Sequence, residues 1–358
     1  MASKVTIQDI ADALGLSRNT VSKAINNTGV LADATRERIL AKAVEMGYKQ
    51  FSYINASGVA NLSAPAAQGE KCEIAVFSTL FLNSSHFAST MLDKFQREAA
   101  QLGYSTTLHR ILPEDIEALD LPMSMNPDRT AGIVCFEVFN EPYARMLSTC
   151  GIPVLFVDTP VCLNEPLDAD CLYMDNTAGI NAFIHNMAER GRKRIGFIGE
   201  YMHCQSFFER YMAYRNSMFL HGLEIEDRFC FTGNFTGGED VSLQHIDQPY
   251  RSYLYHSLKN MKELPEAFIC ANDFIAFDLM QVFKRLGISV PHDVYLFGFD
   301  DSPESRLVTP TLSTVHIHSQ IMGYSATQLL ISRINEPSLN FRTVHTESTL
   351  ILRESTGN

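Results

Sequence analysis

Apolar residues along the first fifty positions recur at helical spacing. From Ile7 they fall at i, i+3, i+4 and i+7, which predicts an amphipathic helix with one apolar stripe. Thr6 precedes this stripe as a candidate N-cap, and Gly15 follows it at the place of a tight turn. A second helix after Ser17 and a third near residue 33 follow the same pattern. This part of the chain is therefore predicted to be all-α.

From Cys72 onward, short apolar runs alternate with helical stretches. The runs have the length and composition of buried strands, and they lie near residues 72–81, 105–112, 131–139, 152–158, 194–200, 267–273 and 294–300. Repeated strand–helix units with buried strands are typical of parallel sheets covered by helices on both faces. Roughly 290 residues are many for one such sheet, so we expect two doubly wound subdomains. Ligands of this architecture bind at the carboxyl ends of the strands.

Charge and cysteine usage narrow the class of protein. The chain carries a net charge of −12, but residues 1–50 hold seven basic and five acidic side chains. This asymmetry points to a separate module at the N-terminal end that binds DNA or a membrane. No apolar run is long enough to span a membrane and no secretion signal is visible, so we expect a cytoplasmic protein. No two of the eight cysteines lie closer than nine residues, which argues against a zinc or redox motif and for inert thiols.

The first two predicted helices form a helix-turn-helix pattern. In this motif the start of the second helix enters the major groove and touches base edges. Arginine and lysine donate to guanine and asparagine pairs with adenine, so four exposed residues are candidate base readers: Arg18, Asn19, Ser22 and Lys23. Three others are placed to contact phosphates: Thr6, Ser17 and Asn26. The alternative is a small helical bundle whose polar face is merely solvated.

The module resembles a known family. Residues 5–48 carry V-T-x-x-D-I-A, then G-L-S, T-V-S-K, T-R-x-R-I and G-Y. This series resembles the N-terminal module of the lactose-repressor (LacI/GalR) family of bacterial transcription regulators. The base readers of that family match Arg18, Asn19 and Lys23. Stretches 191–199, 206–215, 267–277 and 297–302 extend the resemblance over nearly the whole chain.

The resemblance implies a domain organisation. It predicts a helix-turn-helix DNA-binding domain over residues 1–49, a hinge over 50–70 and a ligand-binding core over 71–358. The core is expected to resemble periplasmic binding proteins, with three crossovers and a ligand between two subdomains. We expect the N-subdomain at about 71–161 plus 317–338, and the C-subdomain at about 162–316 plus 339–358.

The linker departs from the family pattern. Family members continue with Tyr-x-Pro-Asn and Ala-Arg-x-Leu, whose leucine wedges into the minor groove and kinks the duplex. Here the proline and the Ala-Arg pair are missing, and Ser57 falls where the leucine is expected. Two alternatives stay open. Either Ile54 or Val59 takes over from a shifted hinge helix, or the hinge inserts no side chain.

Polar residues at strand ends predict a sugar site in the core. Carboxylates, amides and arginine can bond adjacent hydroxyls, and an aromatic face covers C–H surfaces. By resemblance, five residues fall on ligand-binding positions of the family: Phe87, Asp158, Arg210, Asn272 and Asp300. Asp273 and Asp301 are expected to be structural. Phe274 and Ser319 replace residues that line the pocket in some members.

The sequence does not support an enzymatic function. No nucleophile elbow, zinc-protease motif or phosphate-binding loop is present, and we expect no catalytic residue, metal or cofactor. His316 and His318 alternate in a strand-like run, but this spacing alone is weak evidence for a metal-binding site. We therefore expect a homodimeric repressor that binds a twofold operator and responds to a small sugar-like effector. The alternatives are a ligand-dependent activator, a sugar sensor that does not bind DNA, and a cytoplasmic sugar-processing enzyme.

Overall fold

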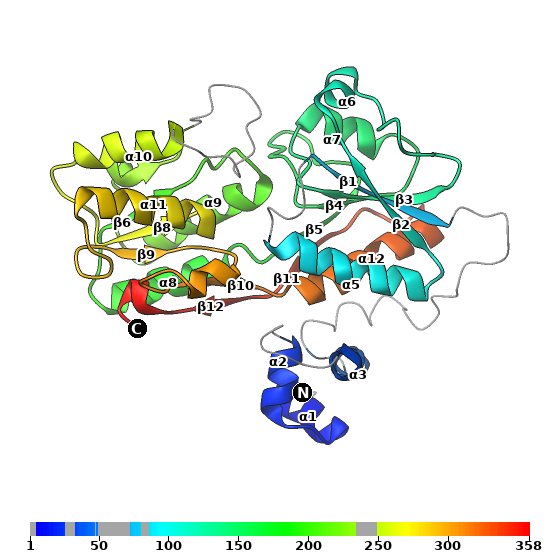
Figure 1. Cartoon of the computed structure of the whole chain (residues 1–358), viewed down its shortest axis with the longest axis horizontal. Coiled ribbons are helices and arrows are strands. Elements are labelled where there is room, and N and C mark those ends of the chain that lie inside the picture. Colours follow the sequence, from blue (N-terminus) through cyan, green and yellow to red (C-terminus); the bar gives the residue numbers. More distant parts are fainter. Residues whose placement is uncertain (1–4, 26–32, 47, 49–71, 80–85, 234–248) are drawn as a thin grey trace.

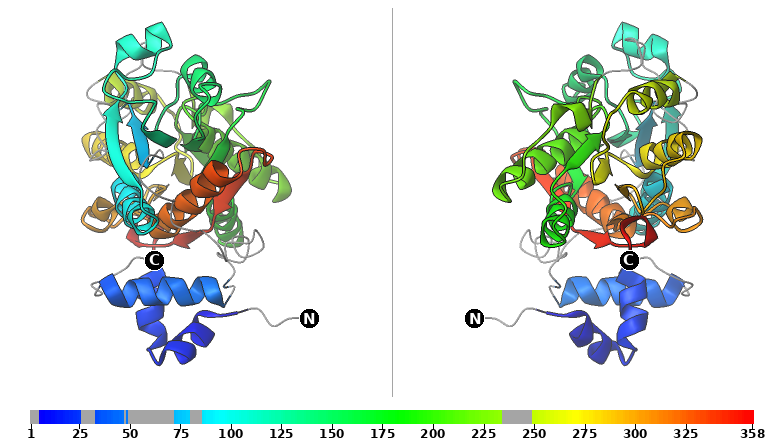
Figure 2. Two further views of the ribbon diagram at one scale, coloured as in Figure 1. Left: turned by 90° about the vertical axis from the view of Figure 1, so that its right-hand side faces the viewer. Right: turned by 90° about the vertical axis from the view of Figure 1, so that its left-hand side faces the viewer.

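A helical module and two α/β subdomains make up the protein (Figure 1). The computed structural model describes residues 5–25, 33–46, 48, 72–79, 86–233 and 249–358. The predicted fold class, a helix-turn-helix module followed by an α/β core of two parallel-sheet subdomains, is confirmed. Figure 2 shows the helical module at one end of the core. No helix in these ranges is long and apolar enough to cross a membrane.

Three helices pack together at the N-terminus: α1 (Ile7–Leu14), α2 (Arg18–Ile25) and α3 (Asp33–Glu45). The Thr6 side chain accepts a hydrogen bond from the Asp9 backbone, and the Asp9 carboxylate accepts one from the Thr6 backbone. This reciprocal capping begins α1, as the sequence predicted. Gly15 ends the helix with φ +64°, a left-handed conformation that glycine adopts without strain. The helices bury a common apolar cluster with no exposed area at Ile10 or Val21.

The first subdomain is built on a six-stranded sheet in which every neighbouring pair is parallel. The strand order is β11-β5-β4-β3-β1-β2, and the bounds are β1 Glu73–Ser78, β2 Ser105–Arg110, β3 Thr130–Phe136, β4 Val154–Val157, β5 Asp170–Met174 and β11 Thr343–Thr346. Four helices accompany it: α5 His86–Gln101, α6 Pro113–Ala118, α7 Glu141–Ser148 and α12 Ser319–Asn335. Alternate residues of β1 belong to separate apolar clusters, Ile74 to one and Ala75 to the other. The sheet is therefore buried on both faces, which explains why its strands appear in the sequence as continuous apolar runs.

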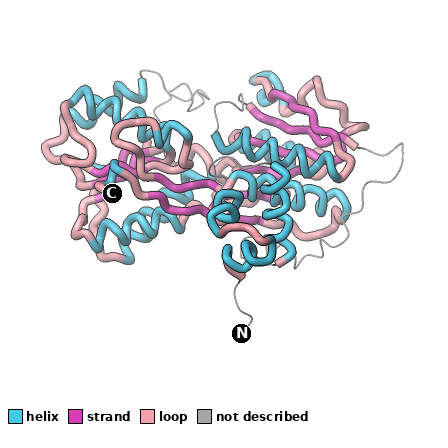
Figure 3. Tube along the Cα trace, turned by 60° about the horizontal axis from the view of Figure 1, so that its bottom comes forward, coloured by secondary structure: helices cyan, strands magenta, loops and turns pink. Residues whose placement is uncertain are grey.

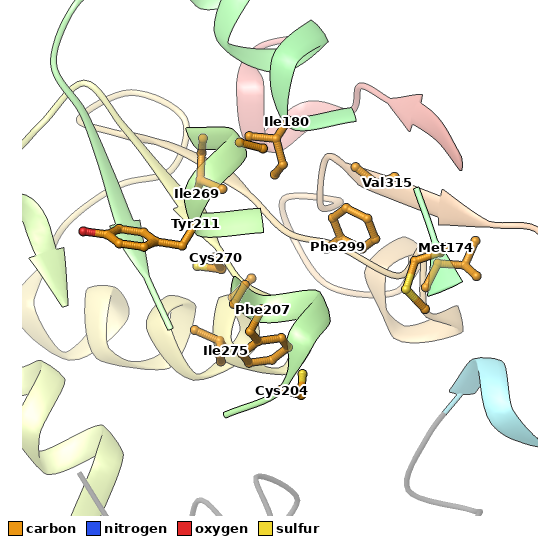
Figure 4. Close-up of a cluster of buried hydrophobic side chains, with 14 of the residues drawn as sticks. Met174, Ile180, Cys204, Phe207, Tyr211, Ile269, Cys270, Ile275, Phe299 and Val315 are labelled. Carbon is orange, nitrogen blue, oxygen red and sulfur yellow. The ribbon is translucent and has the colours of Figure 1, made fainter. Parts of the chain in front are cut away.

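The second subdomain repeats this design on a smaller, four-stranded parallel sheet of order β7-β6-β8-β9. Its strands are β6 Ile195–Ile198, β7 Cys230–Phe231, β8 Ala267–Cys270 and β9 Tyr295–Phe297. Its helices are α8 Ala178–Glu189, α9 Gln205–Leu220, α10 Pro249–Lys259 and α11 Asp273–Leu286, with short 3₁₀ turns at Asp227–Phe229, Pro303–Arg306 and Glu354–Thr356. Buried side chains from β8, α9 and α11 meet in its core, as Figure 4 shows for Ile269, Tyr211 and Ile275. The same cluster reaches Met174 at the end of β5, so the apolar core continues between the subdomains.

The chain crosses between the subdomains three times. It passes from β5 to α8, from β10 (Thr314–Ile317) to α12, and from β11 to β12 (Ser348–Ile351). The last two crossings run side by side, because β10 and β12 form an antiparallel pair. Figure 3 shows strands continuing through the middle of the core between its two halves.

Two strands lie in a different subdomain from the one the sequence suggested. The boundaries at residues 161 and 339 assign β5 and β11 to the C-subdomain, but both strands pair within the first sheet. The physical reason is that a buried parallel strand looks the same in either sheet, so apolar composition does not assign it. The structure divides the core at about residues 175, 318 and 347 instead. Asn26 and the 50–70 hinge, with Ile54 and Val59, lie outside the described residues.

A buried ion cluster holds β5, α12 and β11 together. The Asp170 carboxylate is 1% exposed and accepts two hydrogen bonds from Arg333, at 3.0 and 3.2 Å. Arg342 donates to the same carboxylate from its Nη2, at 3.0 Å, and from its backbone N–H, at 2.7 Å. Although burial by itself raises the pKa of Asp170, the hydrogen bonds from Arg342 and Arg333 outweigh it and lower the pKa.

We predict that Asp170→Asn lowers the free energy of unfolding by about 3–5 kcal/mol, because it leaves the buried Arg333 guanidinium without its charge partner. Denaturant titration at neutral pH measures this loss. The wild type should itself lose this stabilisation in acid. The loss should begin as the pH falls below 3.8, the ordinary pKa of an aspartate, and continue through the lower pKa that Asp170 has in the folded protein. Asp168→Asn, two residues away and exposed, is the control and should stay within about 0.5 kcal/mol of the wild type. Equal stability of the two variants would contradict the role of the cluster.

Candidate functional site

The outer face of α2 presents a row of polar side chains. Arg18 and Asn19 lie in its first turn and Lys23 lies one turn further, and all three are exposed. The opposite face of α2 is buried through Val21 and Ala24. Because the buried face fixes the rotation of the helix, the three polar side chains project together away from the module. This arrangement suits a helix that reads base edges in a major groove.

The predicted phosphate-contacting residues also cap helices. The Ser17 Oγ accepts a hydrogen bond from the Thr20 N–H at 3.1 Å, and the Thr6 hydroxyl donates to the Asp9 carboxylate at 2.7 Å. Ser22 is half-buried on α2. Asn26 lies outside the described residues. Ser17 therefore stands at the start of the exposed helix, where free backbone N–H groups favour an anion.

In the core, Asp158 joins the two subdomains. It follows β4 in the first sheet with φ +62°, and its side chain is buried. Its Oδ1 accepts hydrogen bonds from the backbone N–H groups of Thr159, at 2.9 Å, and Ser206, at 3.1 Å. Ser206 lies in the first turn of α9, in the second subdomain. Burial raises the pKa of Asp158, while these hydrogen bonds and the Arg210 charge act against that rise.

Arg210 lies one turn further along α9 and is 3% exposed. Its Nε donates to the Asn176 Oδ1 at 2.9 Å, and its Nη1 donates to the Ala271 carbonyl at 2.6 Å. The guanidinium lies over the Phe299 ring, 3.6 Å from the centroid. Its Nη1 is 3.8 Å from the Asp300 Oδ1. Residues that follow β5, β8 and β9 therefore converge on one cation.

Asp300 is held in an unusual state. It follows β9 with φ +122°, and its side chain is 15% exposed. Burial raises its pKa to about 7; the charge of Arg210 opposes this rise, and the charge of Glu137 adds to it. Asp273 is fully buried beside it, and burial together with the charge of Asp300 raises its pKa as well. Burial is thus the main reason why these two carboxyl groups resist ionisation, and the charge of Arg210 offsets only part of the rise at Asp300.

The remaining predicted residues take different places. Asn272 caps α11 by accepting a hydrogen bond from the Ile275 N–H at 2.9 Å. The Asp273 carboxylate accepts hydrogen bonds from the Thr314 hydroxyl and the Ser302 N–H, and Asp301 pairs with two arginines, so both have structural contacts. Phe87 lies in the first turn of α5, and its side chain is outside the described part. Asp158, Arg210 and Asp300 are thus brought together around one site.

Sequence reasoning missed four contributors to this site. Asn176 is fully buried and orients Arg210, and its position just after the apolar run of β5 was an available signal. The Phe299 ring lies against the Arg210 guanidinium, but its position in an apolar run predicts an ordinary core residue. Phe139, from the first subdomain, meets His203, from the second, edge to face with ring centroids 5.0 Å apart. Burial lowers the pKa of His203 to about 4, so its ring is neutral at pH 7.

This collection of groups is suited to a polyhydroxylated ligand. A guanidinium, carboxylates and an amide supply directional donors and acceptors, and aromatic rings from both subdomains supply apolar surface. The groups lie at the carboxyl ends of strands in both sheets, which is where open α/β sheets bind ligands. A ligand here would contact both subdomains at once.

Comparisons with known proteins agree with the division of the chain into a helical module and an α/β core. A model of bacterial regulatory proteins of the lacI family matches residues 6–50, and one of a periplasmic binding protein-like domain matches residues 184–356. The chain is 28% identical to the HTH-type transcriptional regulator GalR of Lacticaseibacillus casei, covering 98% of this chain and 99% of that one. It is 25% identical to the ribose operon repressor of Escherichia coli (strain K12), covering 93% and 94%.

Solved structures show the same fold. A complex of the transcriptional regulator CelR with cellobiose superposes with a TM-score of 0.68 at 21% identity, covering 98% of this chain and 100% of that one. The lac repressor dimer bound to operator and the anti-inducer ONPF superposes with a TM-score of 0.63 at 18% identity, covering 99% of each. The chain thus combines a lacI-family helix-turn-helix domain with a periplasmic-binding-protein-like domain, and over nearly its whole length it is similar to bacterial transcriptional regulators.

Proposed function

We propose that this protein is a transcriptional repressor that binds operator DNA through α2 and responds to an uncharged, sugar-like ligand bound around Arg210. The observation that carries the proposal is the match of residues 6–50 to the lacI family together with the exposure of Arg18, Asn19 and Lys23 on one helix face. The protein acts by binding, without turnover. Two copies would place two such helices in successive major grooves of a twofold operator.

The charges around the site narrow the class of ligand. Three carboxyl groups interact here: burial raises the pKa of Asp300 and the charge of Glu137 adds to that rise, while burial and the charge of Asp300 raise the pKa of Asp273. A phosphate or carboxylate on the ligand would add negative charge where Asp300 already resists ionisation. Hydroxyl groups can instead donate to the carboxylates and accept from Arg210. The ligand class that fits is therefore a neutral sugar.

Contacts between the parts of the chain supply a route from ligand to DNA. Asp158 ties the first subdomain to the start of α9, so a change in how the subdomains close alters this contact. The crossover strand β10 leads directly into α12. Ile321, in the first turn of α12, is 1% exposed and belongs to the apolar cluster of the helical module, with Tyr48. Movement of the crossover strands would therefore reach the module through α12, with a coupling typically about 1–3 kcal/mol.

Base reading by Arg18 can be tested by substitution. Arg18→Ala should weaken operator binding by about 1–3 kcal/mol and relax discrimination at one base pair, because a bidentate contact to guanine is lost. Titration of the wild type and the variant against operator mutants measures both effects. Arg38→Ala removes the same charge from the exposed side of α3 and should keep the discrimination. Unchanged discrimination in Arg18→Ala would refute the assignment.

The ligand proposal predicts a pH dependence. A sugar hydroxyl that donates to the Asp300 carboxylate favours its ionised form, so affinity should rise as the pH increases through about 7 and level off above it. Calorimetric titration with the neutral sugar that stabilises the protein in a thermal-shift panel, on either side of pH 7, measures this. Asp300→Asn should remove the pH dependence. Tighter binding of a sugar phosphate than of its neutral parent would contradict the ligand class but leave the DNA-binding role untouched.

The role of Arg210 can be tested by a substitution that keeps its positive charge. Arg210→Lys retains a cation on α9 but loses the planar fork that bonds Asn176 and Ala271 together. We expect the ligand to lose its effect on operator binding, while operator affinity without ligand stays within about threefold of the wild type. Operator titrations with and without the ligand measure both quantities. Loss of operator binding in the absence of ligand would mean that Arg210 is needed for the fold itself.

A further inference from the structure

Two histidines that are far apart in the sequence meet on the surface of the second subdomain. His185 lies on α8, and His221 follows the last residue of α9; both are exposed. The Nδ1 of His185 is 3.2 Å from the Nε2 of His221. The two ring centroids are 5.4 Å apart, and the ring planes are tilted by 48°. The rings therefore face one another through one nitrogen each.

The other nitrogen of each ring already has an acceptor. The Nδ1 of His221 is 2.8 Å from the Ser217 carbonyl oxygen, which can only accept, so this nitrogen carries the proton. The Nε2 of His185 is 3.3 Å from the Glu189 carboxylate, with which it forms an ion pair when the ring is protonated. When His185 carries its proton on Nδ1, it donates a hydrogen bond to the His221 Nε2 across this 3.2 Å contact. When the proton is on Nε2, on the side of Glu189, both facing nitrogens present lone pairs that a cation can bind.

The spacing suits a transition metal. Nitrogen ligands lie about 2.0–2.1 Å from zinc, and two of them at a tetrahedral angle are about 3.3 Å apart. A histidine that binds a metal usually donates its other N–H to a carbonyl or a carboxylate. His221 has this arrangement with the Ser217 carbonyl, and the Glu189 carboxylate lies within 3.3 Å of the corresponding nitrogen of His185. We propose that His185 and His221 form a surface site for a divalent transition metal, Zn²⁺ in the first instance.

The site has two protein ligands and open positions for water. Among the residues that the structure describes, no group of three or more histidine, cysteine or acidic side chains could hold a metal. The site is therefore accessible and exchangeable rather than a closed structural centre. Imidazole ligands favour zinc, copper and nickel over magnesium or calcium.

A bound ion would clamp α8 to α9. These helices pack against each other, and α9 also carries Arg210, so the metal would stiffen the helix that holds the ligand-binding cation. Metal that binds the folded chain more tightly than the unfolded chain raises the melting temperature. The proposal does not depend on DNA binding or on the identity of the effector.

The test is a zinc titration of the full-length protein without a histidine tag. Cys72, an exposed thiol, is first replaced by serine so that it does not compete for the metal. Calorimetry should show one saturable Zn²⁺ per chain, and the melting temperature should rise with added Zn²⁺. His185→Gln and His221→Gln should each weaken binding at least tenfold and remove the rise. Glu189→Gln should weaken binding about tenfold while both ligands remain.

The control is His256→Gln, which removes another exposed histidine, on α10, and should bind zinc as the parent does. Because both proposed ligands are exposed, their variants should melt at the parent temperature when no metal is present. Absence of saturable binding in the parent would overturn the proposal. Zinc binding that is unchanged in both ligand variants would also overturn it.

Discussion

The burial of one guanidinium organises the ligand-binding region. A buried cation is costly unless hydrogen bonds and a counter-charge surround it, so each neighbour of Arg210 is constrained. Asn176 must present its oxygen, Ala271 its carbonyl and Phe299 its face, and these residues follow three different strands. The carboxyl ends of those strands are thereby held at one place. The proposed binding of ligand hydroxyl groups would use the same arrangement.

The two subdomains are joined by more than the three crossings of the chain. Asp158 at the end of β4 accepts a hydrogen bond from the first turn of α9, and the Phe139 and His203 rings meet between the two sheets. Beside these contacts, one apolar cluster continues from the first sheet through Met174 into the second subdomain. A change in how the subdomains close must therefore adjust both the polar contacts and this apolar packing. In the proposed function, such a change is what carries the effect of the ligand to the DNA-binding module.

Helix α9 connects several of these features. Its first turn receives the Asp158 carboxylate, its second turn supplies Arg210, and its C-terminal end leads to the paired histidines His185 and His221. A change at one end of a rigid helix is transmitted along its length, because its backbone hydrogen bonds are satisfied internally. Metal at the exposed end and ligand at the buried end would therefore act on the same element.

The sequence by itself determined the helical module, the parallel α/β core and the resemblance to the lacI family. Helical spacing, capping residues and apolar runs are local signals, so Thr6, Gly15 and the face of α2 with Arg18 could be predicted without coordinates. Only the tertiary structure decided which sheet β5 and β11 join, that Asn176 and Phe299 enclose Arg210, and that His185 lies against His221. These are contacts between segments distant in sequence. Apolar pattern and spacing carry no information about them, because they depend on how the sheets and helices pack.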